Sequence, residues 1–470
     1  MKRIFLVIIS TAAFMFFSGS EAYSFTDVPE GLGKIMDECV KKDVFSGTIL
    51  ASNEGKTVFE RSVGLSDRNS GIKNTNETRY NIASLGKLFT TVMILQLASE
   101  NKLNLDDRIN NYITGTDKRV TIRQLLKHTS GYGDYLNDPE FFQNPSAYAE
   151  TSELTDLILK TPLLFEPGER FSYSNSGFVL LGSVIEKVTG QKYSENLNKR
   201  ILTQLGMNNS EFEFKSGSVP GRAIGYIKDL RGKFSDNSGF AHVPTPAGGM
   251  YSTAEDLNKF GNSLLNDNRL LTDEFKIIMF NDFNDKSPNT LKELFSDPEG
   301  GNAYAGGAPG INSLLLLYPA KKYVVTVLSN YDQAAENIYR NISDLILKGN
   351  LILPNPPAGE FLYAMINEKG LEYVKNNFDK ILSDNGFKIR DDMMLNMLGY
   401  EFLKSGMTDE SIFIFRKNAE LFPDIANCYD SLGEAYLKKG DRENALLNYT
   451  KAVEMNPGNE NARQILKSLK

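Results

Sequence analysis

Short apolar segments of strand length occur near both ends of the first 350 residues, and longer segments with helical patterns lie between them. The segments at each end form a pair separated by a few turn-forming residues, which is typical of a β-hairpin. Strands at both ends with helices between them indicate an antiparallel sheet that joins the two ends of one domain, and hence an α+β fold. The predicted strands are 45–52 and 56–64, around Asn53-Glu54-Gly55, and 311–318 and 323–328, around a turn at 319–322.

The C-terminal part of the chain repeats a set of residues every 34 positions. This period, with Gly between two helical stretches and Pro near the close, resembles the tetratricopeptide repeat, a helical hairpin that buries its apolar face against its neighbours. We expect repeats at 391–424 and 425–458, an earlier hairpin within 361–382 and a capping helix at 459–470. An unrelated helical bundle is the alternative. The recurring pairs are Leu398 and Leu432, Gly399 and Gly433, Gly406 and Gly440, Phe415 and Tyr449, and Pro423 and Pro457.

The first 22 residues predict a secretory signal peptide. Lys2 and Arg3 precede the nearly unbroken apolar stretch 4–17, and Ser20 and Ala22 are small residues of the kind that signal peptidase prefers. We expect cleavage after Ala22 and a periplasmic or secreted protein, with an uncleaved membrane anchor as the alternative. No second run of about 18 apolar residues follows, so no stable membrane span is expected after cleavage.

These patterns predict four parts. After the signal peptide at 1–22 come an α+β domain at 26–350, a Pro-rich linker at 351–360 and the helical repeat region at 361–470.

Composition narrows the classes of partner. The formal net charge is −7 at pH 7, which argues against a nucleic-acid partner, because phosphate binding needs clustered Lys and Arg. The chain has two Cys and two His, too few for a disulfide-rich scaffold or for an ordinary Cys/His zinc site.

Ser-x-x-Lys is the first motif with chemical meaning. On a helix this spacing puts both side chains on one face, where an amine can take the hydroxyl proton and activate the Ser as a nucleophile. Of three copies, only Ser84 with Lys87 precedes a long apolar run, 85–95, which predicts a buried central helix. Free N–H groups at its N-terminus would favour a developing oxyanion, and burial would lower the pKa of Lys87. The alternative is Ser84 as a simple N-cap. The other copies are Ser70 with Lys73 and Ser99 with Lys102.

Tyr-x-Asn is the second motif. Tyr173 and Asn175 lie in a loop, 167–177, that starts with a Pro-Gly turn and leads into an apolar helical segment. A phenol can relay a proton and a carboxamide can hold a substrate amide. Two further copies of the motif are Tyr135 with Asn137 and Tyr339 with Asn341.

The third feature is the Gly-rich stretch 300–310, which contains Tyr304-Ala305-Gly306-Gly307 and precedes a predicted strand. It is not a phosphate loop, since no Gly-Lys-Ser/Thr closes it and no helix follows. It is either a flexible turn or a strand edge without side chains that a substrate backbone can approach.

Together and in this order, the three features resemble the serine β-lactamase and penicillin-binding protein superfamily. The closest branch is the class C β-lactamase-like group, which includes esterases, D-aminopeptidases and carboxypeptidases. Two stretches, 125–131 and 247–257, support the resemblance. It implies a β-lactamase/transpeptidase-like domain, with an antiparallel sheet, flanking helices and an all-helical insertion. In this family the stretch around His128 shapes a loop near the site, so a structural role is expected there, with a catalytic role as the alternative.

The resemblance also implies roles for single residues. Ser84 would attack an acyl carbon, Lys87 with Tyr173 would move the proton to the leaving group, and Asn175 would line the substrate amide. The N–H groups of Ser84 and Gly307 would form the oxyanion hole. Water would then hydrolyse the acyl-enzyme, with no metal or organic cofactor.

One departure from the family pattern concerns the substrate. The family usually has Lys-Thr-Gly or His-x-Gly where this chain has Tyr304-Ala305-Gly306. A cation there helps to bind a substrate carboxylate, so we expect weakened recognition of free carboxylates. Tyr304, Gly306 and Gly307 are the expected substrate-binding residues beside Asn175.

The expected substrate is an ester or amide, including a D-amino-acid or peptidoglycan-derived peptide. The alternatives are a D-alanyl-D-alanine carboxypeptidase or β-lactamase, a decayed enzyme, and a non-catalytic protein that binds wall peptides while its repeats recruit a protein partner.

Overall fold

The computed structural model describes residues 23–24, 27–212, 221–238, 243–281, 296–297, 301–385, 387, 389 and 391–469. The chain divides into two compact units. The predicted signal peptide lies outside the described residues. Within the described ranges, no helix combines the length and the apolar character that crossing a bilayer requires. The first unit comprises Tyr23–Ile227 and Asp236–Pro354, and the second Lys228–Ser235 and Asn355–Lys470.

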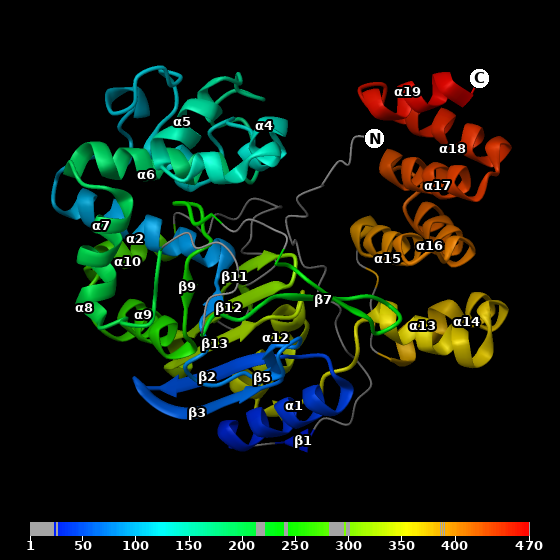
Figure 1. The fold of residues 1–470 in the computed structure, drawn as a ribbon, viewed down its shortest axis with the longest axis horizontal. Helices are drawn as coiled ribbons and strands as arrows, with labels where there is room; N and C mark the ends of the chain where they lie inside the picture. The colour runs from blue at the N-terminus through cyan, green and yellow to red at the C-terminus, as the bar shows by residue number, and fades with distance from the viewer. Residues whose placement is uncertain are drawn as a thin grey trace. The chain divides into compact units, whose positions relative to one another are not determined.

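A six-stranded antiparallel sheet forms the centre of the first unit (Figure 1). Both predicted hairpins are confirmed, and strands from the two ends of the unit lie side by side, since β13 pairs with β2. The expected α+β fold is therefore present. The strand order is β10 (Ser296–Asp297), β11 (Gly301–Ala308), β12 (Ile311–Tyr318), β13 (Tyr323–Ser329), β2 (Gly47–Asn53) and β3 (Lys56–Val63).

The Gly-rich stretch is a strand and not a flexible turn, so that alternative is wrong. Residues Gly301–Ala308 form β11 and pair with β12 along their whole length. Among the described residues, β10 pairs with β11 only at Gly301 and Asn302. The part of β11 that pairs with β10 therefore ends before Tyr304, Gly306 and Gly307.

Helices cover both faces of the sheet. On one face lie α1 (Val28–Lys42) and α12 (Ala334–Lys348), where Ser343 of α12 and Tyr318 of β12 share a hydrogen bond of 2.7 Å. On the other face α9 (Ala254–Asn266) packs Gly261 against Val324 of β13. The sequence patterns predicted neither α1 nor α12.

The predicted central helix is α2 (Gly86–Ser99), and nearly all of its residues are buried. A helix that is apolar on every side needs neighbours on every side, and a helical region supplies them. Phe89 of α2 stacks on Phe260 of α9 with ring centroids 4.1 Å apart. The helical region comprises α3 (Ile122–Leu126), α4 (Pro139–Gln143), α5 (Thr151–Leu159), α6 (Asn175–Thr189), α7 (Tyr193–Leu197), a π-helical turn (Asn198–Leu202), α8 (Thr203–Leu205) and α10 (Asp273–Asn281).

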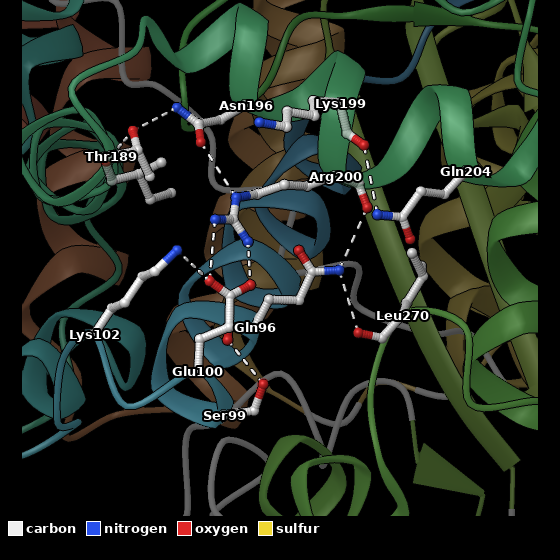
Figure 2. Close-up of polar contacts among 11 residues, drawn as sticks. Gln96, Ser99, Glu100, Lys102, Thr189, Asn196, Lys199, Arg200, Gln204 and Leu270 are labelled. Atoms are coloured by element: carbon white, nitrogen blue, oxygen red, sulfur yellow. Dashed lines mark hydrogen bonds and ion pairs between the residues drawn. The ribbon is translucent and has the colours of Figure 1, made fainter.

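Polar contacts anchor the C-terminal end of α2 to the π-helical turn. Figure 2 shows the Arg200 guanidinium pointing at the Glu100 carboxylate, and the shorter of their two contacts is 2.7 Å. Gln96 Nε2 donates to the Leu270 carbonyl at 3.2 Å. Glu100 lies at the negative end of the helix dipole, which is unfavourable without a nearby cation. Hydrogen bonding from Arg200 lowers the pKa of Glu100 to about 2, against the opposing effect of burial.

Arg200→Gln is expected to destabilise the first unit by about 0.5–1 kcal/mol at pH 7, a modest value because solvent screens the partly exposed Glu100. The folded state lowers the pKa of Glu100, so this stabilisation is complete above its ordinary pKa of 4.5 and is lost as the pH falls towards 2. Urea unfolding of both proteins between pH 7 and pH 3 measures the difference. Lys322→Gln, in an exposed ion pair with Glu54, is the control. A difference that stays constant down to pH 3 would contradict this assignment.

The second unit is a series of antiparallel helix pairs. The hairpin predicted within 361–382 is present as α13 and α14, although α13 begins at Ala358, inside the predicted linker. The 34-residue period has a structural basis, because Gly399 packs against the Phe415 ring as Gly433 packs against the Tyr449 ring. The helices are α13 (Ala358–Lys369), α14 (Leu371–Asp384), α15 (Asp392–Lys404), α16 (Thr408–Leu421), α17 (Ala426–Lys439), α18 (Arg442–Met455) and α19 (Glu460–Leu469).

Candidate active site

Ser84 lies in a tight turn at the start of the buried central helix. Residues Ala83–Leu85 form a 3-10 turn that runs directly into α2. Ser84 is the N-cap of neither element, which rules out the simple capping alternative. Ala83 has a φ of 44°, in the left-handed region, and its N–H donates to Asn81 Oδ1 at 2.8 Å. Strained backbone of this kind often occurs at functional turns.

Two glycines allow other segments to pack against this turn. Gly248 has a φ of +144°, and a Cβ there would lie 2.3 Å from the Ala83 carbonyl oxygen. A Cβ on Gly306 of β11 would lie 2.2 Å from the Ile82 carbonyl oxygen and 2.9 Å from the Leu85 nitrogen. Packing on the turn therefore explains why residue 306 has no side chain, and its contact with a substrate stays a prediction.

The three predicted catalytic side chains meet at one point. Lys87 Nζ lies 3.1 Å from Ser84 Oγ. Tyr173 comes from the loop before α6, and its hydroxyl lies 2.8 Å from the same oxygen. Both distances permit direct proton transfer. The structure therefore brings a hydroxyl and an amine of one segment together with a phenol that lies 89 positions after Ser84.

The Lys87 amine is buried and has fixed neighbours. Its Nζ lies 2.7 Å from Asn175 Oδ1 and 2.7 Å from the Ala247 carbonyl oxygen. Burial lowers the pKa of Lys87 to about 7, and the negative charge of Asp134 opposes that shift. A substantial fraction of Lys87 is consequently uncharged at neutral pH.

His128 supports the Tyr173 ring. The two rings stack with centroids 4.5 Å apart, and His128 Nδ1 accepts a hydrogen bond from the Ser174 N–H at 3.1 Å. Burial, together with the Lys87 charge, lowers the pKa of His128 to about 3, so the imidazole is neutral. These contacts fit the structural role expected for His128. Burial raises the pKa of Tyr173, so its phenol keeps its proton.

Asp134 is a site residue that the sequence analysis missed. Its Oδ2 accepts hydrogen bonds from Asn175 Nδ2 at 2.7 Å and from the Asn175 backbone N–H at 3.2 Å. Its Oδ1 accepts from the Leu136 N–H at 3.0 Å. Burial raises the pKa of Asp134. The available signal was its position, three residues after the stretch 125–131 that supported the family resemblance.

Two residues of the third motif, Tyr304 and Gly307, contact other parts of the first unit. The Tyr304 ring packs against the core of the helical region, and its hydroxyl oxygen is buried. Gly307 is exposed and pairs with Asn312 of β12. Substrate binding by Tyr304 and the Gly307 N–H as an oxyanion donor stay predictions.

Tyr135, from another Tyr-x-Asn copy, directly follows Asp134, and its N–H donates to Ser176 Oγ at 2.9 Å. Residues of two other copies lie elsewhere. Ser99 Oγ donates to the Gln96 carbonyl at the far end of α2, and Tyr339 lies in α12. Across the described part of the chain, no group of three or more His, Cys, Asp or Glu side chains is arranged to hold a metal ion.

Two family models match this chain. The model described as Beta-lactamase matches residues 32–347, and a tetratricopeptide-repeat model matches residues 426–459. The second match covers a unit that the 34-residue period had indicated.

Known proteins are similar to about two thirds of this chain. Protein flp of Staphylococcus aureus (strain N315) is 29% identical over 327 residues, which are 65% of this chain and 63% of that protein, so the match spans less than two thirds of that relative. Penicillin-binding protein 4* of Bacillus subtilis (strain 168) is 27% identical over 320 residues, 63% of this chain and 70% of that protein. The crystal structure of a penicillin binding protein from Bacillus halodurans superposes with a TM-score of 0.58 and 27% identity, over 66% of this chain and 98% of that one.

Proposed function

From the premise that this chain belongs to the beta-lactamase family, whose members are serine hydrolases, we propose that it hydrolyses an ester or amide through an acyl-enzyme on Ser84. One observation carries the proposal: Ser84 Oγ lies within 3.1 Å of Lys87 Nζ and 2.8 Å of the Tyr173 hydroxyl. A Ser hydroxyl becomes a useful nucleophile when a base in this position takes its proton.

The neighbours of Lys87 direct its lone pair to Ser84. An uncharged amine has two N–H groups and one lone pair. The two acceptors at 2.7 Å, Asn175 Oδ1 and the Ala247 carbonyl oxygen, take the two N–H groups. The third neighbour is Ser84 Oγ, so the lone pair faces the hydroxyl and can accept its proton. A pKa of about 7 gives this base a useful population at neutral pH.

Tyr173 has a different role, since burial raises its pKa and keeps the phenol protonated. The phenol donates to Ser84 Oγ in the resting site. Once Ser84 has attacked, the proton held by Lys87 passes with the help of Tyr173 to the departing amine or alkoxide. The backbone N–H groups of Ser84 and Gly307 stabilise the oxyanion in this scheme, and losing one such donor typically costs about a hundredfold or more in rate.

The substrate is an ester or an amide, such as a D-amino-acid derivative or a peptidoglycan-derived peptide. Tyr304 stands where the family usually has a cation, which disfavours a free carboxylate in the substrate. A D-alanyl-D-alanine carboxypeptidase or β-lactamase is a second candidate, supported by the relatives that are named penicillin-binding proteins.

Two probes with one control variant separate these functions. Purified protein is mixed with a fluorophosphonate or with labelled penicillin, and intact mass is measured beside Ser84→Ala. An adduct with the phosphonate alone supports the ester or amide function, and an adduct with penicillin supports the second candidate. An adduct with neither probe contradicts both and leaves a protein that binds wall peptides without catalysis.

Tyr304→Lys is expected to raise kcat/KM for carboxylate-bearing substrates about tenfold relative to neutral ones, because a cation pairs with the carboxylate. Matched p-nitrophenyl esters with and without a free carboxylate measure this ratio. Tyr304→Met, which adds no charge, is the control. No change in the ratio, in a variant that still folds, would count against the carboxylate argument.

Two further proposals concern the rest of the chain. We propose that the protein is exported, on the basis of the basic start, apolar stretch and small residues within 1–22. We also propose that the repeats bind a protein partner, which the match of residues 426–459 to a tetratricopeptide-repeat model supports.

A further inference from the structure

The orientation of the Asn175 carboxamide decides where the lone pair of Lys87 points. With Oδ1 towards Lys87, as the structure has it at 2.7 Å, the amide accepts an N–H from the amine. With the amide turned over, Nδ2 would donate to the amine and take up the lone pair that Ser84 needs. The Ser84 hydroxyl would then have no base to accept its proton.

Asp134 forces the first orientation. An ionised carboxylate only accepts hydrogen bonds, so the amide nitrogen has to face it. Asp134 Oδ2 takes both Asn175 Nδ2 at 2.7 Å and the Asn175 backbone N–H at 3.2 Å. The carboxylate is held in turn by the Leu136 N–H, which donates to Oδ1 at 3.0 Å. One charged side chain therefore fixes both the place and the direction of Asn175.

We propose that Asp134 is a positioning residue for the proposed hydrolase, which acts through Asn175 to keep the lone pair of Lys87 directed at Ser84. The inference rests on the proposed function and assigns Asp134 no contact with the substrate. It extends the contacts at the site, which run from the Asp134 carboxylate through the Asn175 carboxamide and the Lys87 amine to the Ser84 hydroxyl.

Asp134 also acts on Lys87 through its charge. Among the described residues, three titratable groups from other segments face the amine: Asp134 before the turn Tyr135–Asn137, Tyr173 before α6 and His128 after α3. Tyr173 and His128 are neutral near pH 7, since burial raises the pKa of the phenol and lowers that of the imidazole. Burial raises the pKa of Asp134, but the N–H donors of Leu136 and Asn175 and the charge of Lys87 oppose that shift. In its ionised form Asp134 supplies the negative charge that opposes the effect of burial on Lys87. Removing that charge lowers the pKa of Lys87 further.

Two substitutions separate positioning from folding. In Asp134→Asn the new amide can present either its oxygen or its nitrogen to Asn175, so both orientations of the Asn175 amide become accessible and the charge is lost. Asp134→Glu keeps an acceptor-only anion. Asp138→Asn is the matched control, because Asp138 Oδ1 accepts the Glu140 N–H at the start of α4, as Asp134 Oδ1 accepts that of Leu136. Asp138 has the same capping role outside the group of contacts around Asn175.

The experiment measures the second-order rate constant of Ser84 labelling by a fluorophosphonate from pH 5 to pH 9, in the full chain. For Asp134→Asn we expect the plateau to fall about tenfold or more, since misdirected catalytic groups lose much of their rate. We also expect the acid limb to move about half a pH unit or more to lower pH, as loss of a nearby opposite charge requires. Asp134→Glu should return the acid limb to its original pH and recover part of the plateau rate. Asp138→Asn should give the same profile as the unsubstituted protein.

The contradicting outcomes are distinct. In one such outcome the labelling rate of Asp134→Asn falls, its acid limb does not shift, and Asp134→Glu does not recover the rate. This would mean that Asp134 only maintains the fold. It would overturn the inference while leaving the proposed function intact. Labelling of Asp134→Asn equal to that of Asp138→Asn would overturn it as well. An unsubstituted protein that never labels would overturn the proposed function, and the inference with it.

Discussion

Lys87→Met will lower the rate of Ser84 acylation by about three orders of magnitude or more, because the substitution removes the only base within direct reach of the hydroxyl among the described residues. Met fills much of the same buried space without a charge. The alternative base would be an ionised Tyr173, but burial raises the pKa of that phenol and keeps it protonated. The loss should appear with both fluorophosphonate labelling and p-nitrophenyl ester hydrolysis.

The pH dependence of the unsubstituted protein follows from the same base. Lys87 accepts the Ser84 proton only when it is uncharged, and burial lowers its pKa to about 7. The labelling rate should therefore rise with pH and reach its plateau above about pH 7–8. In Lys87→Met this rise should disappear. Lys102→Met, at the exposed Lys of another Ser-x-x-Lys copy, is the control and should leave the profile unchanged. Substantial labelling of Lys87→Met with an unaltered profile would show that another group is the base.

Tyr173→Phe will lower kcat by about a hundredfold for anilides and much less for p-nitrophenyl esters. The reason is the leaving group: an anilide nitrogen needs a proton to depart, whereas p-nitrophenolate leaves without one. Phe keeps the ring that stacks on His128 at 4.5 Å, so the fold of the loop should persist. Steady-state kinetics on a matched pair of D-amino acid substrates, one anilide and one p-nitrophenyl ester, measure the ratio.

Tyr339→Phe, at another copy of the Tyr-x-Asn motif, is the matched control for this experiment, because Tyr339 lies in α12. Equal losses for both leaving groups in Tyr173→Phe would mean that the phenol acts on the nucleophile and not on the leaving group. No loss with either substrate would remove Tyr173 from the mechanism.

Local patterns were sufficient to predict much of the framework. The apolar run after Ser84 predicted a buried helix, and the spacing of three placed Lys87 on the same face. Asn53-Glu54-Gly55 predicted the hairpin of β2 and β3. The 34-residue period indicated the helix pairs, because Gly399 and Gly433 each accommodate an aromatic ring of the next helix. In each case the determining contacts are close in sequence or recur with a fixed period.

Long-range contacts explain what the sequence could not predict. The Gly-rich stretch forms a strand because β12 pairs with it and because Gly306 fits against the Ile82 carbonyl, a contact that spans most of the unit. Asp134 is one of many acidic residues in the sequence, and its role depends on Asn175, 41 positions later. Gly248 likewise matters through Ala83, whose strained backbone gives no signal in the sequence.

The identity of the labelled residue tests whether Ser84 is the nucleophile. Protein treated with a fluorophosphonate at pH 8 is digested, and the modified peptide is sequenced by mass spectrometry. We expect a single adduct on Ser84, which is absent from Ser84→Ala and formed far more slowly in Lys87→Met. An adduct on a different residue, or one that persists in Ser84→Ala, would contradict the claim that Ser84 is a nucleophile activated by Lys87.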